Sequence, residues 1–108
     1  MTFNEYQALA KTTAIYPEQY RLIYPVLGLA GETGEVSEKV KKLIRDANGA
    51  ITDDFRENLK KELGDVLWYL SAVSTDLGLT LDDIAQANYD KLKDRMERNK
   101  IHGSGDNR

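Results

Sequence analysis

The stretch that decides the fold is 28-GLAGETGEVSEKVKKLIRDA-47, and a related stretch, 60-KKELGDVLWYL-70, follows it. In both, apolar residues recur at spacings of three, four and seven, which is typical of an amphipathic helix. Each stretch also carries an acidic pair, Glu-x-x-Glu in the first and Glu-x-x-Asp in the second. Carboxylates usually lie on the solvated face of a helix, so acidic pairs beside apolar stripes need a physical reason.

The whole chain is predicted to be helical, because no segment alternates polar and apolar residues as a strand would. Capping residues, Pro17 and Asn48-Gly49 divide it into four helices. We expect these helices over residues 2–16, 25–47, 52–77 and 80–98. The predicted core stripes of the two central helices include Leu29, Val36, Val40, Leu43, Leu59, Leu63, Val66, Leu67, Leu70, Val73 and Leu77. The prediction is one all-α domain over residues 1–108, a four-helix-bundle-type fold with a polar tail from about residue 99.

Composition excludes several classes of function. A formal net charge of −3 without a basic stripe argues against a nucleic-acid partner. We find no signal-like start and no apolar run long enough to cross a bilayer, so no membrane partner is expected. The chain has no cysteine, and its one histidine, His102, lies in the polar tail. This removes thiolate and imidazole metal sites from the core and fits a cytoplasmic protein.

The acidic pairs are expected to converge. Glu32 and Glu35 share one helix face at i, i+3, and Glu62 and Asp65 do the same on the next helix. The loop at residues 48–52 is short, so these two helices should pack antiparallel, with both pairs at similar heights. Four converging carboxylates would repel one another unless a cation lies between them.

The ligand chemistry selects the kind of cation. Carboxylate oxygens without histidine or cysteine favour a hard ion, Mg²⁺ or Mn²⁺, and less readily Ca²⁺. Mg²⁺ sites usually keep waters and accept phosphate oxygens from a substrate, which indicates a phosphate-bearing ligand. A di-iron bundle would need Glu-x-x-His motifs, which this core lacks. The plain alternative is a solvated acidic surface, which two pairs on adjacent helices make less attractive.

The residues LGLAGETGEVSEKVKK followed by ELGDVLWYL resemble the MazG-like nucleoside triphosphate pyrophosphohydrolases of the all-α NTP pyrophosphatase superfamily. The resemblance continues through GLTLDDIAQANYDKLKDR to HGSGDNR and covers roughly residues 27–108. It implies hydrolysis of a nucleoside triphosphate between its α and β phosphates, which yields a nucleoside monophosphate and pyrophosphate. The implied cofactor is Mg²⁺, with Mn²⁺ as a substitute.

The resemblance also implies residue roles. Glu32, Glu35, Glu62 and Asp65 match the metal ligands, and either Glu35 or Glu38 would orient the attacking water.

Substrate contacts are implied on the fourth helix, where Asn88, Lys91 and Arg95 match positions that face the substrate. Lysine and arginine suit this role because they hold phosphate oxygens and offset the charge of the departing pyrophosphate. Tyr69 shares the acidic face and suits either contact with a ribose or base, or ordinary helix packing. Trp68 is interpreted as a core or subunit-interface residue.

The family is typically dimeric or a dimer of dimers, with helices from two protomers completing one bundle, so a homodimer or homotetramer is expected. Three functions remain open. The first is a nucleotide-clearing enzyme acting on dNTPs or NTPs. The second is a narrow-substrate enzyme acting on dCTP, dUTP or phosphoribosyl-ATP. The third is a non-catalytic helical module that binds nucleotides or partner helices.

Overall fold

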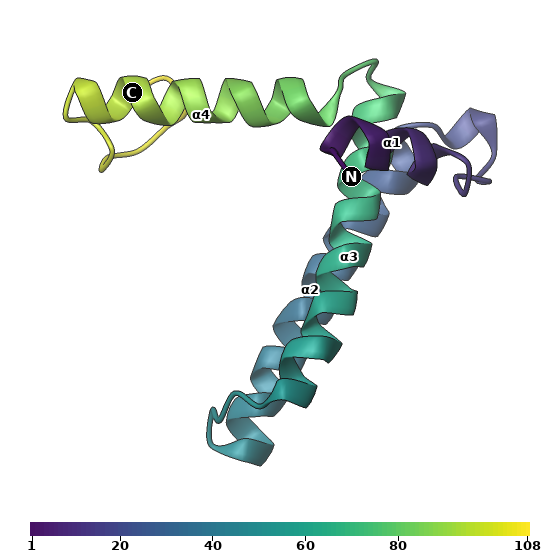
Figure 1. The fold of residues 1–108 in the computed structure, drawn as a ribbon, viewed down its shortest axis with the longest axis vertical. Helices are drawn as coiled ribbons and strands as arrows, with labels where there is room; N and C mark the ends of the chain where they lie inside the picture. Colours follow the sequence, from purple (N-terminus) through teal and green to yellow (C-terminus); the bar gives the residue numbers. More distant parts are fainter.

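The computed structural model describes all 108 residues as helices and connections, without a strand (Figure 1). The elements are α1 (Phe3–Lys11), a 3₁₀ turn η1 (Glu18–Tyr20), α2 (Ile23–Ala47), α3 (Asp53–Asp76) and α4 (Leu81–Glu97). The all-α prediction is confirmed. No helix is both long and apolar enough to cross a membrane.

Local side-chain chemistry sets the helix ends. Thr2 forms a capping box with Glu5, and Thr52 and Thr80 each accept a backbone N–H in the first turn of α3 and α4. Asn48 ends α2 in the left-handed conformation, as the Asn48-Gly49 signal predicts.

Only the first helix departs clearly from its predicted bounds. It ends at Lys11, several residues before Pro17. The hydroxyls of Thr12 and Thr13 donate to the carbonyls of Leu9 and Ala10. These local hydrogen bonds satisfy carbonyl groups at the helix end and so favour an early stop.

α2 and α3 form a long antiparallel hairpin whose register is visible at one close contact. The ring of Tyr69 lies directly against Gly28, so closely that a Cβ atom at position 28 would overlap the ring. The other α2 glycines, Gly31 and Gly34, and Gly64 on α3 have no neighbouring atom at the equivalent position. Close helix approach therefore explains Gly28, and within one chain it does not explain the other three.

α1 lies across the end of this hairpin and fixes the corner between α3 and α4. The Gln7 amide nitrogen donates to Thr75 Oγ1 at 3.1 Å and to the carbonyl of Leu79 at 2.9 Å. Its amide oxygen accepts the backbone N–H of Leu81 at 2.8 Å. One side chain thus joins the end of α3 to the start of α4, and α4 projects away from the hairpin (Figure 1).

Asp76 anchors the connection between α1 and α2. Its Oδ2 accepts hydrogen bonds from the Tyr16 hydroxyl and the Leu22 backbone N–H, both at 2.8 Å. Leu22 has a φ of 66°, which is unusual for a bulky residue, and Ile23 N–H donates across it to the Arg21 carbonyl. The buried carboxylate therefore holds a strained turn at the start of α2.

The single chain buries little of itself. Only seven of its 108 residues are buried, and its radius of gyration is 16.8 Å. A compact domain of this length has a radius of about 13 Å. Val40, Leu63 and Leu77, which the sequence assigns to core stripes, are 39%, 51% and 52% exposed. The bundle is open in one chain because α4 does not lie along the hairpin.

Gly28→Ala tests the hairpin register. The added methyl must displace the Tyr69 ring, so we expect a loss of about 1–3 kcal/mol in the free energy of unfolding. Gly34→Ala is the matched control, because it adds the same methyl to the same helix in open space. That variant should be neutral or more stable by up to about 1 kcal/mol. Urea denaturation followed by circular dichroism measures both, and equal stabilities would contradict the assigned contact.

Candidate metal centre

Three of the four predicted metal ligands meet between α2 and α3. Carboxylate oxygens of Glu32, Glu62 and Asp65 all lie within 4.8 Å of one another. The register explains this meeting: Glu32 lies one turn after Gly28, and Asp65 lies one turn before Tyr69, so the two face each other across the hairpin. Glu62 occupies the next turn of α3, on the same face as Asp65.

The charge of this cluster is incompletely balanced. Partial burial raises the pKa of Glu32, and the nearby charges of Asp65, Glu62 and Glu35 raise it further. The one cation that pairs with the cluster is Lys39, whose Nζ lies 3.6 Å from Glu62 Oε1. Three carboxylates beside a single ammonium leave net negative charge, which a bound divalent cation would neutralise.

The two remaining acidic candidates have different surroundings. Glu35 is exposed and lies outside the three-carboxylate cluster, yet it is near enough for its charge to raise the pKa of Glu32. Glu38 pairs with Lys41 at 2.9 Å, and this contact lowers the pKa of Glu38. The structure therefore places Glu35 beside the cluster and commits Glu38 to a surface ion pair.

Aromatic residues of α3 flank the acids. Tyr69 lies in an open depression together with Glu32, Asp65, Trp68 and Thr13. Burial raises the pKa of Tyr69, and the neighbouring Tyr24, Glu32 and Asp65 raise it further. The Tyr69 hydroxyl therefore keeps its proton. Trp68 Nε1 donates to Thr13 Oγ1 at 2.8 Å, which fixes the indole at the edge of the acidic cluster.

The predicted substrate contacts Asn88, Lys91 and Arg95 lie on α4, and one chain does not bring them to the acidic cluster (Figure 1). Lys91 Nζ is 3.2 Å from Asp106 Oδ1, and Arg95, only 4% exposed, donates to the Asp106 carbonyl. Lys91 and then Arg95 hold the pKa of Asp106 below its usual range. The tail therefore folds back on α4 and supplies an anion to both cations.

Sequence reasoning did not assign this role to Asp106, although Asp106 is the one acidic residue after position 99. The signal in the sequence was a single acidic residue in a basic, glycine-containing tail, which could have indicated an ion pair with the cations of α4. Sequence reasoning also did not identify Asp76 as an anchor, because its partners come from residues 16–22, more than fifty positions away.

The MazG nucleotide pyrophosphohydrolase domain family matches residues 25–99. This chain belongs to that family. The matched region contains α2 from Pro25 onward, α3 and α4, and therefore every acidic residue of the cluster. The "Gene 37 protein" of Mycobacterium phage L5 is 45% identical to the chain over 114 residues, and the alignment covers all of both proteins. No solved structure matches significantly.

The residues present fit the divalent metal that MazG domains use. The cluster offers oxygen donors only, from two facing helices, and carries excess negative charge. Hard cations such as Mg²⁺ and Mn²⁺ prefer this donor set. Glu32, Glu62 and Asp65 would hold the ion, with Glu35 adjacent.

Glu32→Gln tests whether repulsion strains the metal-free site. A raised pKa means that the folded chain disfavours ionised Glu32, so its charge lowers stability at neutral pH and ceases to do so as pH falls to about 4. In EDTA at pH 7 we expect the variant to melt a few degrees above wild type, with the difference vanishing near pH 4. Glu38→Gln, which removes a favourably paired charge, should show no gain. Equal melting shifts for the two variants at pH 7 would contradict the repulsion.

Proposed function

We propose that this chain hydrolyses nucleoside triphosphates, dNTPs or NTPs, between the α and β phosphates, releasing a nucleoside monophosphate and pyrophosphate in a Mg²⁺-dependent reaction. Mn²⁺ is the expected substitute ion. We place this activity in the cytoplasm, because the chain has no cysteine and acts on nucleotide pools.

The observation that carries the proposal is the meeting of Glu32, Glu62 and Asp65 in a chain of the MazG nucleotide pyrophosphohydrolase domain family. Three carboxylates do not attract a phosphate group by themselves, because carboxylates and phosphates are both anionic. They suit a phosphate substrate only through a shared cation, which neutralises phosphate oxygens when it is bound.

Glu35 is our candidate for orienting the attacking water. Its carboxylate is exposed beside the cluster and makes no ion pair, so it is free to accept a proton from water. Glu38 is the weaker candidate because Lys41 already occupies its carboxylate. This contrast supports a choice that the sequence left open.

Lys91 and Arg95 are proposed to hold the phosphates of the substrate. In the free chain both cations contact the Asp106 carboxylate. A substrate phosphate, which is also negatively charged, would take the place of this carboxylate. Both cations suit this exchange because ammonium and guanidinium groups bind carboxylate and phosphate by the same charge-assisted hydrogen bonds. Asn88 and Tyr69 remain proposed contacts to the sugar or base.

A homo-oligomer, either a dimer or a tetramer, would place these α4 residues near the acids. Within one chain α4 projects away from the hairpin (Figure 1). Many large apolar residues of the hairpin and of α4 are exposed, including Leu27 at 68%, Leu63 at 51% and Leu92 at 44%. Packing α4 of a second copy against the hairpin would cover apolar surface and bring Lys91 and Arg95 towards the cluster.

Glu35→Gln and Glu38→Gln form a matched pair for testing the catalytic assignment. We expect Glu35→Gln to lower kcat by about 10²-fold or more, because loss of a general base has this effect. Glu38→Gln should stay close to wild type. Ion-exchange analysis of a nucleotide panel, with and without Mg²⁺, measures both and identifies the products. Absence of any cleavage by the wild-type protein would overturn the proposed activity and favour a nucleotide-binding module.

Sedimentation velocity tests the oligomer. We expect a dimer or tetramer at micromolar concentration, because an isolated chain with so little buried surface is marginally stable. Leu27→Glu should shift the population towards monomer, whereas Lys61→Glu, at an exposed position opposite the apolar stripe of α3, should not. A stable wild-type monomer would contradict the proposed assembly.

A further inference from the structure

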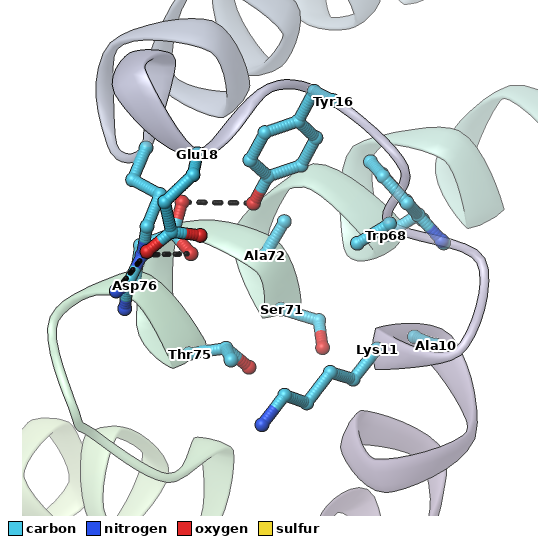
Figure 2. Close-up of a pocket in the computed structure, with 11 residues that line it drawn as sticks. Ala10, Lys11, Tyr16, Glu18, Trp68, Ser71, Ala72, Thr75 and Asp76 are labelled. Atoms are coloured by element: carbon cyan, nitrogen blue, oxygen red, sulfur yellow. Dashed lines mark hydrogen bonds and ion pairs between the residues drawn. The ribbon is translucent and has the colours of Figure 1, made fainter.

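A cavity of about 300 Å³ lies between α1, the connection after it and the C-terminal half of α3 (Figure 2). We call it the Trp68 pocket; its walls include Ala10, Lys11, Tyr16, Trp68, Ser71 and Asp76. The volume falls at the lower end of the range for small-molecule sites. Alanines at positions 10, 14 and 72 leave this room, and an indole and a phenol supply flat walls.

The Trp68 pocket adjoins the acidic cluster. Trp68 lines both this pocket and the open depression that contains Glu32 and Asp65, so its indole separates the two. Ser71 follows Asp65 by six residues on α3, which is about 9 Å along the helix axis. This distance is about the length of a nucleoside. A nucleotide whose phosphates lie at the acids would therefore place its nucleoside in the pocket.

Most polar groups of the pocket already have partners. Asp76 accepts from Tyr16 and Leu22, and Thr75 Oγ1 accepts from Gln7. Two groups have no hydrogen-bond or ion-pair partner within the chain: the hydroxyl of Ser71, a residue that is only 1% exposed, and the ammonium of Lys11, an exposed residue. Figure 2 shows both side chains extending into the space between α1 and α3. No buried side-chain polar atom of the chain lacks a partner, so the Ser71 hydroxyl is open to the pocket, where a ligand can hydrogen-bond to it.

The free groups favour one kind of ligand edge. An ammonium group only donates hydrogen bonds, whereas a serine hydroxyl donates or accepts one. A carbonyl oxygen satisfies Lys11 and Ser71, but an exocyclic amino group facing Lys11 would set donor against donor.

We propose that the Trp68 pocket binds the nucleoside of the substrate, and that Ser71 and Lys11 select bases with a carbonyl edge, meaning a carbonyl at pyrimidine C4 or purine C6 (uracil, thymine and guanine), over cytosine and adenine, which carry an amino group there. This inference rests on the proposed function, in which the substrate is a nucleotide. It adds the subsite and its specificity, which the acidic motif does not determine.

Fluorescence of Trp68 tests the proposal directly, because Trp68 is the only tryptophan in the chain. The metal-free full-length protein is titrated with uridine, thymidine, guanosine, cytidine and adenosine, which carry no phosphate and do not need the acidic cluster. We expect the three carbonyl-edge nucleosides to change the emission with a Kd about tenfold or more below that of cytidine and adenosine.

Ser71→Ala should reduce that preference by about tenfold, as expected for one lost hydrogen bond. Ser74→Ala is the matched control: Ser74 is equally buried on α3, but its hydroxyl donates to the Leu70 carbonyl. It should leave the preference unchanged. Equal binding of all five nucleosides, or equal effects of the two serine variants, would overturn the selection by Ser71.

The two proposals fail in different ways. Nucleotide hydrolysis without any Trp68 response to nucleosides or to nucleoside monophosphates would overturn the pocket assignment and leave the activity standing. Selective nucleoside binding without hydrolysis of any triphosphate would support the pocket and overturn the activity.

Discussion

The contact between Tyr69 and Gly28 is the constraint on which the acidic cluster depends. α2 and α3 are antiparallel, so the residue one turn after Gly28 faces the residue one turn before Tyr69. These residues are Glu32 and Asp65, two members of the cluster. A ring packed on a helix backbone tolerates no side chain at the point of contact. The glycine therefore contributes to the metal centre through helix register, without contacting an acid itself.

The remaining parts of the site are distributed over an open chain. The hairpin carries the carboxylates, α4 carries the candidate phosphate-binding cations, and α1 with its connection closes the Trp68 pocket. Gln7 sets the corner between the hairpin and α4. The apolar faces of the hairpin and of α4 are exposed. The proposed oligomer would cover these faces and bring the cations of α4 to the carboxylates.

Sequence alone was sufficient where local chemistry decides. Threonine caps, the Asn48-Gly49 stop and the apolar periodicity predicted the ends of three helices closely, and simple helix geometry predicted that acids would meet. It failed where distant side chains decide. The direction of α4 follows from Gln7, whose partners lie about seventy positions away. The exposure of Leu63 and Leu77 follows from that direction, so no periodicity argument reveals it.

Direct measurement of ion binding tests the central claim, that the facing acids of α2 and α3 form a divalent metal site. Electron paramagnetic resonance reports free Mn²⁺ during titration of the wild-type protein and of Glu62→Gln. The account predicts at least one bound Mn²⁺ per chain, displaced by Mg²⁺, and an affinity lower by about tenfold or more in the variant, because it loses one charged ligand. Unchanged Mn²⁺ affinity in Glu62→Gln, or no binding by the wild-type chain, would contradict it.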